Sequence, residues 1–263
     1  MLNGNNIKTL FSFFFKTGIR SRRAKLFFLV SLIPTVIFVI VRVVALVNPD
    51  RHFSLPGLYL QVGGVFYFQL FIQLLCLFYG SAVISDELDN KTLVYLTTSP
   101  VSRASILTGK FLAHWVISII IIIGGIVISF VMANFSKLTQ VEYLEKLGLL
   151  SGVAFLAISA YSALFTFLGI LMKKSILVGL FFIFGWESVV QFFPGTTQKL
   201  TVNHYIKSLL PANLSGTRSI LSFRLQSSPA PEAIVTLVFI ALIFLCLAAF
   251  LFYKKEFLLA DQG

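Results

Sequence analysis

Charge is scarce in this chain of 263 residues. Asp, Glu, Lys and Arg together make up 12% of the sequence, about half the share found in soluble domains. Hydrophobic residues make up 57% and the mean hydropathy is +0.93. Several apolar runs exceed the roughly 20 residues that a helix needs to cross the hydrocarbon of a bilayer. A water-soluble globule is therefore excluded, and we predict an all-α integral membrane protein.

Acidic residues are the rarer charged class, with 10 Asp and Glu against 21 Lys and Arg. A net charge of +11 would suit nucleic acid, but the basic residues flank the apolar runs, as membrane topology requires. We therefore expect membrane lipid as a partner, and no nucleic acid. The chain has two cysteines, Cys76 and Cys246, and both lie inside apolar runs. No disulfide framework is indicated.

Motifs that would mark an enzyme are also missing. A phosphate-binding loop needs a glycine five residues before its Gly-Lys pair, and Ala104 stands at that place before Gly109-Lys110. Neither a zinc-binding H-E-x-x-H motif nor a G-x-S-x-G nucleophile motif occurs. The three histidines lie in different segments. We predict no catalytic, cofactor-binding or metal site in this chain, which forms a single domain over residues 1–263.

Six apolar runs are long enough to be read as membrane spans. The first follows about 25 basic, Phe-rich residues without a small-residue cleavage site, so we interpret it as a retained span and not a signal peptide. An even number of spans places both termini on the same side of the membrane. The predicted spans are Leu26–Val47, Leu58–Ser85, Ile106–Ala133, Leu147–Met172, Ser175–Phe193 and Ala233–Tyr253.

The distribution of cations predicts the orientation. Thirteen Lys and Arg residues fall on the side that holds the termini and residues 85–110, against seven on the other side. Because cytoplasmic segments carry the excess of Lys and Arg, both termini are expected in the cytoplasm. The predicted location is the cytoplasmic (inner) membrane, as a multi-pass protein.

Residues 1–25 have the pattern of an interfacial amphipathic helix. The apolar residues follow the spacing of one helix face, and lysines fall elsewhere on the helix, where they can meet anionic headgroups. The alternative is a frayed basic tail. The apolar residues are Ile7, Leu10, Phe11, Phe14 and Phe15, and the lysines are Lys8 and Lys16.

Residues 84–110 are the longest polar stretch in the N-terminal half, and they join two predicted spans. Asp86, Glu87 and Asp89 are predicted to open a short helix, because acids favour a helix N-terminus. Pro100 should break the chain, and Ser102 is placed to cap the third span. A helix joined rigidly to two spans would move both when pushed. The alternative is an ordinary solvated loop.

The same stretch resembles the membrane permeases of type-2 ATP-binding-cassette (ABC) exporters. The resemblance is carried by Glu87, Thr92-Leu93, Tyr95-Leu96, Ser99 to Arg103, Ile106-Leu107 and Gly109-Lys110. It implies a cytoplasmic coupling helix between spans 2 and 3 that docks on a separate ABC ATPase, which binds the ATP. It also implies a second permease chain, in a homodimer or a heterodimer. The implied coupling residues are Asp86, Glu87, Thr92, Leu93, Leu96, Pro100 and Arg103.

One departure is Lys91, where these permeases often have glycine before the Thr-Leu; this change leaves the implied docking role intact and indicates a particular ATPase partner. The resemblance further implies that the external segment 194–232 forms short helices that re-enter the outer leaflet. Backbone at that depth must be helical or buried in protein. A receptor-like external loop is the alternative.

Three polar side chains inside the predicted spans are candidates for a transport path or for packing. A charged Glu187 at mid-depth would cost about 2.5–3.5 kcal/mol or more, so it should be paired, protonated or facing water. Gln69 and Gln73 share a stripe with Gln61 that would suit either a lumen or interhelical hydrogen bonds. Ser and Thr among the Gly and Ala of 147–172 indicate close helix packing. The expected function is the transmembrane subunit of an ABC exporter; the alternative is a non-transporting membrane scaffold.

Overall fold

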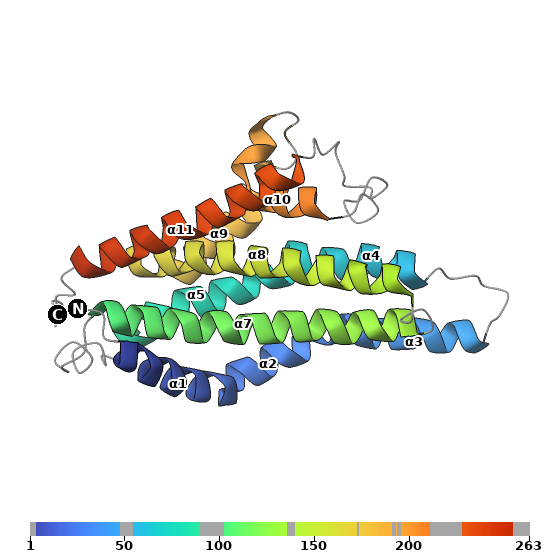
Figure 1. Cartoon of the computed structure of the whole chain (residues 1–263), viewed down its shortest axis with the longest axis horizontal. Helices are drawn as coiled ribbons and strands as arrows, with labels where there is room; N and C mark the ends of the chain where they lie inside the picture. The colour runs from blue at the N-terminus through green and yellow to red at the C-terminus, as the bar shows by residue number, and fades with distance from the viewer. Residues whose placement is uncertain are drawn as a thin grey trace.

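The computed structural model is a bundle of long helices that run roughly along one axis (Figure 1). The described residues contain no β-strand. Within the described part of the chain, five helices are long and apolar enough to cross a membrane, which confirms a multi-pass, helical membrane protein. The structure describes residues 4–47, 55–89, 103–135, 140–172, 174–190, 193, 196–210 and 228–254.

The first span is a broken helix. Helix α2 (Arg22–Ser31) and helix α3 (Ile33–Val47) meet at Leu32. Pro34 lies just beyond the break, and a proline lacks the N–H that would continue the α-helical ladder. The break leaves carbonyl groups without helical partners, and the Tyr67 hydroxyl donates to one of them, the Ser31 oxygen, at 2.7 Å. The break is therefore fixed by a hydrogen bond from the second span.

The second span combines α4 (Leu55–Gly64), the π-helical η1 (Val65–Phe71) and α5 (Ile72–Asp89) into one long helix. A π-helical turn takes an extra residue relative to an α-helical turn, so the residues beyond it shift by about 100° around the axis. Sequence spacing across η1 therefore does not predict which side chains share a face.

The third and fourth spans are α7 (Arg103–Asn134) and α8 (Val141–Leu171). Both are longer than the predicted runs, and α8 begins six residues before Leu147. The last span is α11 (Ala230–Lys254), close to its predicted bounds. Helix α8 packs against α5 and α11, and α7 packs against the N-terminal helix α1 (Gly4–Arg20).

The predicted fifth span is a shorter apolar stretch. Helix α9 (Ser175–Phe181) continues into the π-helical η3 (Phe182–Glu187), and this stretch is shorter than the five candidate spans. It is followed by the 3₁₀-helix η5 (Thr196–Leu200) and α10 (Val202–Leu209). Figure 1 shows α10 beside the first turns of α11. Helices α7 and α8 extend farther along the bundle axis than α10 does.

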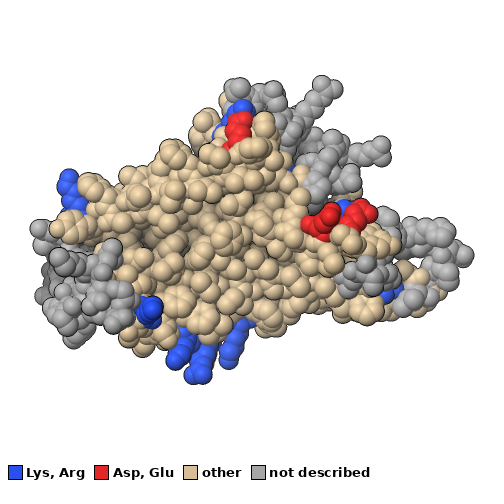
Figure 2. All heavy atoms as spheres, viewed as in Figure 1, with Lys and Arg blue, Asp and Glu red and all other residues tan. Residues whose placement is uncertain are grey.

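The start of α1 and the end of α11 lie at the same end of the bundle, together with the end of α5 and the start of α7 (Figure 1). Figure 2 shows Lys and Arg projecting over the junction of α1 and α2, whereas the middle of this face carries no charged atoms. An uncharged belt of this kind fits the hydrocarbon region of a bilayer.

Candidate functional site

Most of the predicted coupling segment lies outside the described residues. Thr92, Leu93, Leu96 and Pro100 belong to the part for which no structure is described. Helix α7 begins at Arg103, the residue after the predicted cap Ser102. What the structure describes is therefore the base of the segment, where the chain leaves α5 and enters α7.

One detail of the sequence interpretation is wrong. Asp86, Glu87 and Asp89 do not open a separate helix, because their backbone forms the last turns of α5. The reason is local: neither glycine nor proline occurs between Gly80 and Pro100, so nothing breaks the span where it passes from apolar to polar sequence.

A small apolar cluster holds four helices together at the base of this segment. It consists of buried side chains from α5, α7, α8 and α11, which pack separately from the main core. The two helices that flank the coupling segment are thus tied to two other spans within a turn or two of its ends. The cluster residues are Val83, Leu107, Ile170, Ala248 and Phe252.

Helices α5 and α8 are in backbone contact through two glycines. A methyl group on Gly80 would lie 2.9 Å from Cβ of Phe165 and 3.1 Å from the backbone nitrogen of Thr166. One on Gly169 would lie 3.0 Å from both Cα and the backbone oxygen of Ser81. Small residues let membrane helices approach this closely. We infer that α5 and α8 move as one unit.

Helix α1 packs on α7 in a similar way. A methyl group on Gly109 would lie 2.9 Å from Cβ of Leu10, and one on Gly18 would lie 2.6 Å from the Cδ1 atom of Ile117. The apolar face that the sequence predicts for this helix is the face that meets α7, and Lys8 and Lys16 are exposed. In the sequence, Gly109 stands out as part of a Gly-Lys pair. The structure shows that it is a packing residue, because it lies against α1.

The three polar candidates within the spans have different environments. Gln69 is exposed, as is Gln61, whereas Gln73 is 2% exposed. They therefore do not share one environment, since only Gln73 is enclosed by neighbouring helices. Gln73 Nε2 donates to the Tyr161 hydroxyl at 2.9 Å, and that hydroxyl hydrogen bonds the Glu187 side chain.

Glu187 anchors helix α10. Its side chain is 1% exposed, and its two oxygens accept hydrogen bonds from the backbone N–H groups of Val202 at 3.0 Å and Asn203 at 3.1 Å. These N–H groups open α10, where the helix dipole favours a carboxylate. A hydrogen-bonded chain thus runs from α5 through α8 and η3 to α10. This geometry supports packing as the role of Glu187.

Helix α10 carries one buried basic residue, His204, and one that is partly buried, Lys207. Burial lowers the pKa of Lys207, and its interaction with Glu187 acts in the opposite direction. Burial is also the main cause that lowers the pKa of His204, whose Nε2 lies 3.2 Å from the Ser228 hydroxyl. Ser228 precedes α11, so these contacts attach α10 to the last span as well as to η3.

Two features escaped the sequence analysis. Tyr161 was not singled out, although a tyrosine among small residues in an apolar run indicates a buried hydroxyl that needs a partner. The pair Tyr59 and Tyr67 was also missed; both hydroxyls approach Ser129 of α7, at 3.2 and 3.1 Å.

Arg42 donates to the Met132 carbonyl near the end of α7 at 3.2 Å, which fits a cation beside a helix C-terminus.

The described ranges contain no group of three His, Cys, Asp or Glu side chains that could hold a metal ion. Their notable features are instead closely packed helices, an apolar cluster that joins four helices where α5 ends and α7 begins, and helix α10 held by Glu187. The class that these define is a polytopic membrane protein whose helices are closely packed.

One protein family matches nearly the whole chain. The model of the ABC-2 family transporter protein matches residues 7–257, nearly the whole chain, and the chain therefore belongs to this family. It is a membrane component of an ABC transporter, a family that normally works with an ABC ATPase. Comparison with curated proteins gave no match.

Proposed function

We propose that this chain is the permease subunit of an ABC exporter, driven by ATP that a separate ATPase subunit hydrolyses. Two permease chains and two ATPase chains would form the working complex. ATP-driven closure of the ATPases would push the segment 84–110 and shift the bundle between inward-open and outward-open forms. In this arrangement the chain crosses the membrane six times, with Ser175–Phe193 as the fifth span and both termini in the cytoplasm.

The observation that carries the proposal is the rigid base beneath the coupling segment. The glycine contacts between α5 and α8 bring the two backbones close together, so that these helices pack tightly. The apolar cluster adds α7 and α11 to the same unit. Because packed cores switch between discrete arrangements and do not deform continuously, a displacement of the segment would be passed on to four spans.

The external segment 194–232 would close the path on the far side. Support comes from the attachment of α10 to Glu187 and to the start of α11. Since η3 and α11 both hold α10, a movement of either would change its position. Glu187 would then act as the anchor of the external gate.

A charge reversal at Glu87 tests the coupling role. Removing one member of a buried charge pair at an interface costs about 2–5 kcal/mol, so Glu87→Lys should release the ATPase or uncouple ATP hydrolysis from transport. Expression and membrane insertion should stay normal. The measurement is copurification with the ATPase, followed by ATP hydrolysis and transport in proteoliposomes.

Lys146→Glu is the control. Lys146 pairs with Glu142 at 2.6 Å on the surface of α8, and such exposed pairs contribute about 0–1 kcal/mol. This variant should behave as wild type. If Glu87→Lys keeps full ATPase association and full transport, residues 84–110 are an ordinary loop. If the ATPase binds but no substrate moves under any condition, the scaffold alternative is favoured.

A further inference from the structure

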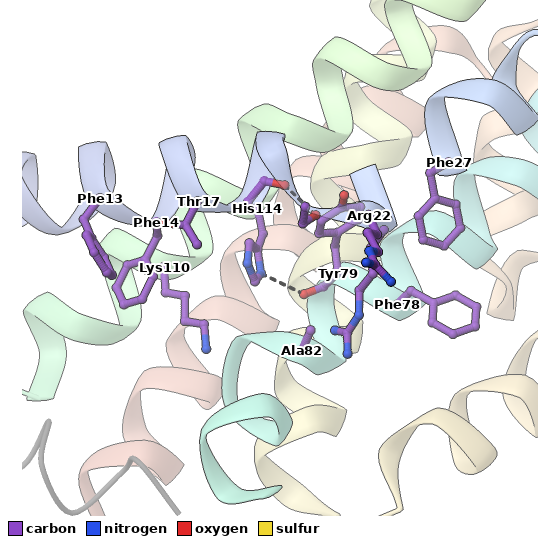
Figure 3. Close-up of a pocket in the computed structure, with 13 residues that line it drawn as sticks. Phe13, Phe14, Thr17, Arg22, Phe27, Phe78, Tyr79, Ala82, Lys110 and His114 are labelled. Carbon is purple, nitrogen blue, oxygen red and sulfur yellow. Dashed lines mark hydrogen bonds between the residues drawn. The ribbon is translucent and has the colours of Figure 1, made fainter. Parts of the chain in front are cut away.

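A pocket of about 500 Å³ lies between α1, the start of α2, α5 and α7. Figure 3 shows Phe13 and Phe14 at one end of it and Phe27 and Phe78 at the other, with Ala82 of α5 between them. Its size is within the range of small-molecule sites. Apart from Lys110, its lining residues lie outside residues 84–110, and none of them belongs to α10.

The lining is basic and aromatic. Arg22 and Arg23 contribute from the start of α2, and Lys110 contributes from α7, where it is 5% exposed. Lys110 and Arg22 lie on opposite sides of Ala82 in Figure 3. Among the lining side chains that the structure describes, none is acidic. Because α2 begins at Arg22, the positive end of its dipole adds to this charge.

The position of the pocket decides what kind of anion can reach it. It lies where α1 meets the first span, at the end of the bundle that holds both termini (Figure 1). Phe78 is 39% exposed and Phe13 is 62% exposed, so the aromatic walls continue onto the outer surface of the bundle. A ligand that suits both the basic lining and the aromatic walls has a compact anionic group and an attached apolar chain.

We propose that this pocket binds the phosphate headgroup of an anionic phospholipid, from the leaflet on the side of both termini. The three cations hold the phosphate, and the acyl chains lie against Phe27 and Phe78. A lipid bound there contacts α1, α2, α5 and α7 together. It fastens the amphipathic helix to the two spans that flank the coupling segment.

The test is a titration of the purified full-length chain in neutral detergent, with bound lipid counted by native mass spectrometry. Phosphatidylglycerol should bind in preference to phosphatidylcholine. The soluble headgroup glycerophosphoglycerol should bind far more weakly than the lipid, and equal binding of the two would overturn the lipid assignment. Since each cation near an anionic group contributes roughly fivefold in affinity, Arg22→Gln/Arg23→Gln should weaken binding about 25-fold.

Lys8→Gln/Lys16→Gln is the matched control. It removes the same charge from exposed positions on α1 that do not line the pocket, and it should leave the affinity within about twofold. An equal loss in both double variants would overturn the proposal, because general surface charge would then explain binding. Thr17→Phe, which fills the pocket without changing charge, should also weaken binding; unchanged affinity there would place the lipid elsewhere.

Discussion

Adding one methyl group at Gly169 should loosen the contact between α5 and α8. The methyl carbon would lie 3.0 Å from Cα and from the oxygen of Ser81. Both are backbone atoms of α5 and cannot rotate away. Favourable contacts between carbon atoms are about 3.5–4.0 Å long, so the two helices would have to separate by about half an ångström. Overpacking of this kind costs about 1–3 kcal/mol.

Gly152→Ala supplies the reference, because a methyl group there meets nothing within 4 Å. Both glycines are in α8, so both variants gain the same helix propensity, about 0.5–1 kcal/mol. The difference between them isolates the packing cost. We expect Gly169→Ala to unfold about 1–3 kcal/mol more easily than Gly152→Ala, measured by denaturant titration in mixed micelles. Equal stability of the two variants would refute the claim that α5 and α8 form one rigid unit.

Two other predictions concern the external side. Glu187→Gln leaves one acceptor oxygen where two backbone N–H groups donate, so this variant should lose about 1–3 kcal/mol of stability in thermal unfolding. The control is Glu142→Gln at an exposed ion pair, which should cost at most about 1 kcal/mol. Equal losses of stability in the two variants would argue against Glu187 as the anchor of α10. For topology, a cysteine at Ser99 should react with impermeant reagents only from the cytoplasm and one at Thr197 only from outside, in a chain without Cys76 and Cys246. Reaction of both from the same side contradicts the six-span proposal.

The five helices that are long and apolar enough to cross a membrane could be predicted from local sequence. A span is defined by apolar length, which needs no knowledge of neighbouring segments. The last span was placed within three residues of its observed bounds. The family could also be recognised, because the residues between Glu87 and Lys110 are adjacent in sequence. The break in the first span is also a local feature, since proline interrupts an α-helix and Pro34 lies next to the break. The sequence analysis does not use Pro34 to predict it.

The environments of the polar residues could not be predicted in the same way. Gln61 and Gln73 belong to the same span, but Gln61 is exposed, whereas Gln73 is buried and donates to Tyr161 of α8. The need of Glu187 for partners followed from the cost of a charge in hydrocarbon. Its actual partners are backbone groups at the start of α10 and the hydroxyl of Tyr161.

The sequence by itself determined a basic, multi-pass helical membrane protein of the ABC-2 family, since composition, run length and adjacent motifs are local properties of the chain. Only the tertiary structure decided which glycines are contact points: Gly80, Gly109 and Gly169 meet neighbouring helices, whereas Gly152 meets nothing. The same holds for the basic pocket at α2, whose cations come from positions almost 90 residues apart in the chain. Contacts of this kind depend on how helices approach one another, and that approach is set by the packing of the whole bundle.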